Sequence, residues 1–144
     1  MDSLISMVKN YAKEMPSKLA SDDNSFDEEN VKNLFFSIMA GRGFILIDSD
    51  NKGFLVGIIV NNIWFPKILE LHELAWWVKP EFRSTSVGGK LWIEFNKKAD
   101  KLLTDGRIKV ITTSLMVNSP EIDYLKRGYK LLEKTYIKEA SCQQ

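Results

Sequence analysis

The hydrophobic positions in the first 43 residues twice follow the 3.6-residue period of an amphipathic helix. The first stripe ends at Pro16, and the second follows the capping-box pair Ser25 and Glu28 and ends near Gly41. The apolar positions are Leu4, Ile5, Val8, Tyr11, Ala12 and Met15 in the first stripe, then Val31, Leu34, Phe35, Ile38 and Met39 in the second. We therefore predict two helices, separated by the acidic run at residues 21–30.

The pattern then changes to short apolar runs that are typical of strands. Residues 44–47 and 54–60 flank the turn sequence Asp-Ser-Asp-Asn-Lys-Gly, which predicts a β-hairpin. A longer run at residues 68–78 is rich in aromatic and aliphatic side chains and ends before a proline. We predict a central strand there.

The remaining pattern predicts a long helix over residues 87–106, a strand over 109–115, a short helix over 119–128 and a last strand over 129–138. The order ααβββαβαβ contains no repeat and no linker long enough to separate domains. We therefore predict an α/β structure in a single domain, residues 1–144, with a central sheet flanked by helices.

Composition narrows the class of protein. The chain has 144 residues, 44% of them hydrophobic and 27% charged, as expected for a folded domain. The longest unbroken apolar stretch, residues 53–60, is far shorter than the roughly 20 residues of a membrane helix. The N-terminus lacks the features of an export signal, so we expect a cytoplasmic protein without membrane contact. One His and one Cys are too few for a usual zinc site, so no metal is expected and Cys142 is interpreted as inert.

Charge is unevenly distributed along the chain. The net charge of +1 argues against bulk binding to nucleic acid. Residues 1–78 carry 7 Lys/Arg and 11 Asp/Glu, or −4, whereas residues 79–144 carry 13 and 8, or +5. The second half is therefore the part suited to attract an anion.

Residues 76–91 carry the clearest chemical signal, because a strand passes through a turn of small residues directly into a long helix. The first N–H groups of such a helix have no intrahelical acceptors, and the helix dipole favours an anion there. Arg83 and Lys90 add positive charge to the turn. The small residues are Ser84, Thr85, Ser86, Gly88 and Gly89. The alternative interpretation is a capped helix whose glycines allow close packing. The P-loop and dinucleotide-binding patterns are both absent.

The segment Val78–Leu91 resembles the acetyl-CoA signature of the GNAT superfamily of N-acetyltransferases. That signature consists of Arg or Gln, any two residues, Gly, any one residue, and then Gly or Ala, and it wraps a pyrophosphate. In this chain Ser86 stands at the position where the first Gly is usual. Asn118 and the segment Tyr124–Tyr129 resemble a second, downstream motif of this family, and the similarity extends over residues 44–138. The run from Ala75 to Arg83 is also similar to short members encoded by bacteriophages.

This resemblance implies a GNAT-like mixed central sheet and direct transfer of an acetyl group from acetyl-CoA to an amine acceptor. It implies that backbone amides of Trp76, Trp77 and Val78 bind the acyl oxygen and pantetheine, and that Tyr124 donates a proton to the departing thiolate. Tyr124 packed beside Gly128 is the structural alternative. The residues implied to bind the cofactor are Trp76, Trp77, Val78, Arg83, Ser84, Thr85, Ser86, Val87, Gly88, Gly89, Lys90, Asn118 and Tyr124.

The general base has three candidates on the predicted central strand. Alternation places Glu70 and His72 on one face and Glu73 on the other, unless a β-bulge changes the parity. His72 has a suitable ordinary pKa, and a glutamate is able to act directly or through water. We predict Glu73 and His72 as catalytic candidates; polar residues facing solvent at a strand start are the alternative.

The sequence says less about the amine acceptor and the binding partners than about the cofactor. The acidic run is compatible with a cationic amine acceptor, but a solvated loop is the preferred explanation of these charges. Large aromatics are more often core than pocket walls, and Trp92 on the helical stripe is expected in the core. An open sheet edge would suit a homodimer. The alternative functions are a non-catalytic acyl-CoA-binding or interaction protein, and, more remotely, a nucleotide- or phosphoprotein-binding module.

Overall fold

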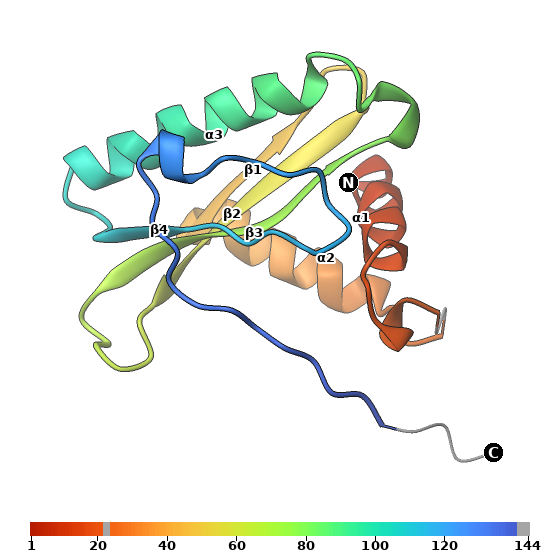
Figure 1. Cartoon of the computed structure of the whole chain (residues 1–144), viewed down its shortest axis with the longest axis horizontal. Coiled ribbons are helices and arrows are strands. Elements are labelled where there is room, and N and C mark those ends of the chain that lie inside the picture. The colour runs from red at the N-terminus through yellow and green to blue at the C-terminus, as the bar shows by residue number, and fades with distance from the viewer. Residues whose placement is uncertain (22–23, 141–144) are drawn as a thin grey trace.

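The computed structural model describes residues 1–21 and 24–140 (Figure 1). The helices are α1 (Asp2–Lys13), α2 (Glu28–Ser37) and α3 (Val87–Thr104), and the strands are β1 (Gly43–Ile47), β2 (Gly53–Asn61), β3 (Leu69–Val78) and β4 (Val110–Thr112). Short helical segments are η1 (Lys18–Ser21), the π-helical η2 (Ile38–Arg42), η3 (Pro80–Phe82) and η4 (Leu125–Arg127). No helix in these ranges is long and apolar enough to cross a bilayer.

The four strands form one mixed sheet in the order β1-β2-β3-β4. β1 pairs antiparallel with β2, β2 pairs antiparallel with β3, and β3 pairs parallel with β4. The hairpin forms because Asp48 accepts hydrogen bonds from the turn amides of Asp50 and Lys52, as expected of a side-chain turn former. The predicted α/β class with a mixed sheet flanked by helices is confirmed.

Helices cover both faces of the sheet, with α2 along one face and α3 along the other (Figure 1). The α1 and α2 side buries a cluster that includes Leu4, Phe35 and Phe54, each at most 3% exposed. The α3 side buries Trp92 and Phe95. Trp92 is thus in the core, as predicted.

An extra residue in β3 changes which face its side chains occupy. Gly57 pairs with Glu73 and Val56 pairs with Ala75, so Leu74 is left over as a β-bulge. Leu71 therefore packs on the α3 side, whereas Ala75 belongs to the cluster on the opposite side.

The cap of α2 differs from the prediction. Asp27, rather than the Ser25 and Glu28 pair, is the N-cap, and its side chain accepts a hydrogen bond from the amide of Asn30 at 2.9 Å. Asp27 directly precedes the helix, so its carboxylate reaches the third helical amide.

The predictions for residues 109–138 are wrong in detail. The predicted helix at 119–128 is a single turn, η4, closed by Gly128 in the left-handed region at φ 85°. The predicted strand at 129–138 is not in the sheet, and the predicted strand at 109–115 pairs only as β4. Strand formation needs a partner as well as a suitable sequence, and the chain leaves the sheet after Thr112.

Candidate active site

β3 and β4 pair over only three residues and then separate. The last parallel pair joins His72 to Thr112, and beyond it the chain after β4 leaves a gap beside β3. A cavity of about 380 Å³ occupies this region. Its walls are Tyr11, Glu14, Glu73, Leu74, Trp76, Trp77, Val78, Arg83, Thr85, Gly88, Gly89, Ser114, Leu115, Met116, Asn118, Ser119, Pro120, Ile122 and Tyr124. The cavity thus joins β3, the turn before α3 and the segment that contains Tyr124.

One end of the cavity lies at the turn between β3 and α3. The amides of Arg83, Thr85 and Val87 are hydrogen bonded inside the turn. Within residues 1–21 and 24–140, no acceptor is present for the amides of Ser84, Ser86, Gly88 and Gly89. The start of this 18-residue helix therefore presents unmet donors and a positive dipole end, as an anion site requires.

Ser86 does not obstruct this turn. It is the N-cap residue of α3, but its side chain makes no capping hydrogen bond, and it is not among the cavity walls. A Cβ added at Gly89 would meet no atom within 4 Å. The fold itself therefore does not require glycine at this position.

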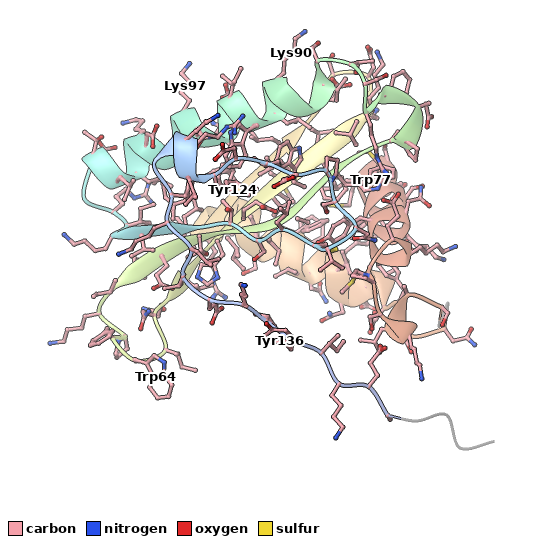
Figure 2. The ribbon with its side chains drawn as sticks, in the orientation of Figure 1. Trp64, Trp77, Lys90, Lys97, Tyr124 and Tyr136 are labelled. Atoms are coloured by element: carbon pink, nitrogen blue, oxygen red, sulfur yellow. The ribbon has the colours of Figure 1, made fainter. Side chains whose placement is uncertain are left out.

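The predicted cofactor residues divide into two groups. The cavity walls include Trp76, Trp77, Val78, Arg83, Thr85, Gly88, Gly89, Asn118 and Tyr124. The walls do not include Ser84, Ser86, Val87 and Lys90. Val87 is buried in the core at 8% exposure, and Lys90 points away from the sheet (Figure 2).

Tyr124 carries a buried hydroxyl that lacks a partner. In the described chain no group makes a hydrogen bond of good geometry to this oxygen, and the side chain of Thr113 makes only a looser polar contact with it. Its ring packs edge-on against Trp92, with ring centroids 5.6 Å apart. Burial raises the pKa of Tyr124, as does the charge of Glu73, against a smaller opposing effect of Thr113. Burial and the charge of Glu73 therefore hold the phenol protonated, and Tyr124 is one of the cavity walls.

Glu73 lies at the fork between β3 and β4. Burial raises the pKa of its carboxyl to about 7, although the backbone of Ser114 partly opposes the shift. Glu73 in turn raises the pKa of Tyr11 and Tyr124, after burial, because a nearby negative charge disfavours a phenolate. A carboxyl with this pKa is able to exchange a proton near neutral pH.

His72 lies elsewhere. Its Nε2 is 2.9 Å from Oε2 of Glu70, and the side-chain amide of Asn62 donates a hydrogen bond to the other carboxylate oxygen, Oε1. These two bonds lower the pKa of Glu70, and neither His72 nor Glu70 lines the cavity. Of the predicted base candidates, only Glu73 is brought to Tyr124.

Tyr11 and Glu14, at the end of α1, are cavity walls that the sequence pattern does not predict. Glu14 accepts hydrogen bonds from Nη2 of Arg83 and Nε1 of Trp77. Tyr11 carries no separate signal, because it occupies the apolar stripe of an amphipathic helix. Its position over β3 depends on tertiary packing.

Other predicted features lie away from the cavity. None of the described residues of the acidic run 21–30 lines it, and Asp22 and Asp23 lie outside the described residues, as does Cys142. Trp64 is 81% exposed in the loop between β2 and β3 (Figure 2). Of the four tryptophans, Trp76 and Trp77 form cavity walls.

Two comparisons of the sequence found no relative: no protein-family model matches the chain, and no curated protein matches it at a significant level. Comparison of the structure, in contrast, found similar solved structures over nearly the whole chain. A GNAT family acetyltransferase from Staphylococcus aureus subsp. aureus has a TM-score of 0.56 and 17% identity, covering 96% of this chain and 88% of that chain.

Two further neighbours differ in their described roles. AAC(6')-Iy, in complex with the bisubstrate analogue CoA-S-monomethyl-acetylneamine, has a TM-score of 0.57 and 13% identity, covering 98% of this chain and 91% of that chain. A transcriptional regulator from Bacillus halodurans has a TM-score of 0.64 and 9% identity, covering 96% of this chain and 95% of that chain. The chain therefore has the fold of the GNAT acetyltransferases.

Proposed function

We propose that the protein is an acetyl-CoA-dependent N-acetyltransferase that transfers the acetyl group directly to an amine acceptor. One observation carries the proposal. A single cavity joins a turn of unmet amides to the unpaired hydroxyl of Tyr124 and to Glu73, whose pKa is about 7. Anion binding, proton donation and proton acceptance are thus available in one space.

The residues present fit coenzyme A. The free amides of Gly88 and Gly89 and the open space at Gly89 suit a diphosphate, while Trp76, Trp77 and Asn118 line the path toward Tyr124. When bound, acetyl-CoA supplies an activated acetyl thioester. Among the described residues, no strand pairs with β3 beyond His72 on the side that faces the gap, so backbone amides on this edge are available to polarise a carbonyl.

Tyr124 and Glu73 take opposite proton roles. Tyr124 holds its proton at neutral pH because burial and Glu73 both disfavour the phenolate, so it is suited to protonate a leaving sulfur. Glu73 is suited to accept the proton of an attacking amine, directly or through water. His72 keeps no part in this proposal because it pairs with Glu70 outside the cavity.

The test combines thiol release with binding. Purified protein mixed with acetyl-CoA and a panel of neutral, acidic and cationic amines is expected to release free thiol with at least one amine. Tyr124→Phe should lower kcat by about 100-fold, the scale of a lost general acid, while calorimetry shows unchanged affinity for acetyl-CoA. Lys97→Ala, on the outer face of α3, is the matched control (Figure 2). Unchanged turnover in Tyr124→Phe would remove this residue from the mechanism.

The second candidate function is acyl-CoA binding without turnover. The fold similarity to a transcriptional regulator favours keeping it, because that neighbour is not described as an acetyltransferase. Stoichiometric binding of acetyl-CoA without thiol release from any amine would support this alternative. The likeness to phage-encoded members and the expected homodimer remain predictions.

A further inference from the structure

Glu14, at the C-terminal end of α1, holds the side chains of two predicted cofactor residues. Both of its carboxylate oxygens accept a hydrogen bond from Nη2 of Arg83 at 2.7 Å, and Oε1 also accepts one from Nε1 of Trp77 at 2.9 Å. Arg83 donates its Nε to the carbonyl of Val78 at 2.9 Å. In the described chain, Nη1 is therefore the guanidinium nitrogen of Arg83 without a partner.

This arrangement places a carboxylate in the anion site. Glu14 and Arg83 both line the cavity, and each side chain of the pair is 40% exposed, so solvent and ligands reach them. A diphosphate at the amides of Gly88 and Gly89 would meet the charge of Glu14 and would need the same guanidinium. A diphosphate that takes Nη2 of Arg83 has to displace Glu14, and one that takes only Nη1 still meets the negative charge of Glu14, so the pair with Glu14 opposes cofactor binding.

The contact also connects the cofactor turn to α1. The side-chain amide of Asn118 donates a hydrogen bond to the backbone carbonyl of Glu14 at 2.7 Å. Three predicted cofactor residues, Arg83, Trp77 and Asn118, are thus bound to one residue of this helix. Any ligand that takes Arg83 from Glu14 weakens the attachment of the α1 end.

We propose that Glu14 is a positioning residue that Arg83 exchanges for the diphosphate of the cofactor, so that cofactor binding releases the end of α1. This inference rests on the proposed use of acetyl-CoA. A carboxylate that only supported the fold would not compete with the ligand, and its neutral isostere would bind coenzyme A no more tightly.

The experiment titrates coenzyme A into four proteins at low salt: the natural sequence, Glu14→Gln, Glu14→Asp and Glu81→Gln. Glu14→Gln keeps an acceptor oxygen for Trp77 but removes the charge, so its Kd should fall about two- to fivefold, the range of an exposed ion pair. Glu14→Asp keeps the charge and should not bind more tightly. Glu81→Gln is the control, because it removes an exposed carboxylate of η3 that does not contact Arg83 in the described chain. Its affinity for coenzyme A should increase by less than half as much as that of Glu14→Gln.

Two further measurements test whether the effect of Glu14 depends on Arg83 and whether cofactor binding releases the end of α1. In an Arg83→Met background, Glu14→Gln should no longer tighten binding, because the guanidinium that both anions share is gone. In the natural protein, coenzyme A should accelerate amide hydrogen exchange in residues 14–20. An unchanged or weaker affinity in Glu14→Gln, or an equal gain in Glu81→Gln, overturns the exchange. Absence of coenzyme A binding by the natural protein would instead overturn the proposed function, and this inference with it.

Discussion

At the scale of single residues, the raised pKa of Glu73 follows from its buried position in β3, directly before the bulge. Leu74 is the extra residue of β3, so Glu73 is the last side chain before the faces of the strand change. It lies at the fork from β4, where burial raises its pKa from 4.5 to about 7. A buried carboxyl costs stability when it is charged, and the same property suits it to proton transfer.

Glu73→Gln should therefore separate stability from activity. The folded state holds the proton more tightly than the unfolded state between pH 4.5 and about 7, so stability contributed by this group falls as pH rises through that window and stays low above it. At pH 8 the neutral variant should melt higher by roughly 2–4 °C for each kcal/mol gained. Its kcat/KM should fall by about 100-fold or more.

Thermal melting at pH 4 and pH 8, together with thiol-release kinetics, measures both effects. The natural protein should also gain kcat/KM as pH rises through about 7, because the base must lose its proton before it acts. Retained turnover in Glu73→Gln would eliminate Glu73 as the base.

At the scale of elements, the first turn of α3, which follows β3, is regular helix but contains glycine, a residue of low helix propensity. Gly89 lies in the first turn of α3, does not adopt a positive φ, and has open space where a Cβ would stand. Glycine inside a helix is less favourable than alanine by up to about 1 kcal/mol. The helix α3 is thus less stable than it would be with alanine at this position, but its backbone at Gly89 is accessible.

Gly89→Ala is expected to raise the melting temperature by up to about 4 °C while weakening coenzyme A binding by about tenfold. The added methyl helps the helix but stands between a diphosphate and the free amides. Calorimetric titration and thermal melting of the same sample test both parts. Lys97→Ala, which lies farther along α3, should leave the affinity unchanged. An affinity that survives Gly89→Ala would mean that no ligand approaches this backbone.

At the scale of the whole molecule, the C-terminal segment is extended but belongs to no sheet. Its side chains Leu131, Leu132 and Tyr136 are 71%, 75% and 86% exposed. Its far end is held by Glu139, which accepts hydrogen bonds from Ser17 and Lys18 at 2.6 Å. β4 is an edge strand of the four-stranded sheet, so an unpaired edge and an unpaired strand-like segment occur in one chain.

This combination predicts a homodimer in which the segments 129–138 add to sheet edges of the partner copy. Light scattering coupled to size exclusion should report twice the monomer mass at micromolar concentration. Thr135→Pro should shift the protein toward monomer, because proline removes a strand N–H, whereas Thr135→Ser should not. The melting temperature of the monomer should not change, since the amide of Thr135 has no described partner. A natural protein that stays monomeric at about 100 μM would contradict this prediction.

Local pattern alone determined much of the structure. The amphipathic stripes, the Asp48–Gly53 turn and the long helix from Val87 were predictable because helix period, turn chemistry and capping act within a few residues. The prediction of an anion site at the turn is equally local, since small residues before a helix leave its first amides accessible. Alternation along β3 also separated Glu73 from His72.

Only the tertiary structure decided what surrounds those residues. The pKa of Glu73 depends on burial at a fork between strands, and the unpaired hydroxyl of Tyr124 depends on the packing of η4 against α3. The contact of Glu14 with Arg83 joins residues 69 positions apart. Segment 129–138 has strand-like sequence, but a strand also needs a partner, and partners are set by the arrangement of the whole chain. Burial, charge pairing and strand pairing are interactions between distant segments, and a local pattern does not contain them.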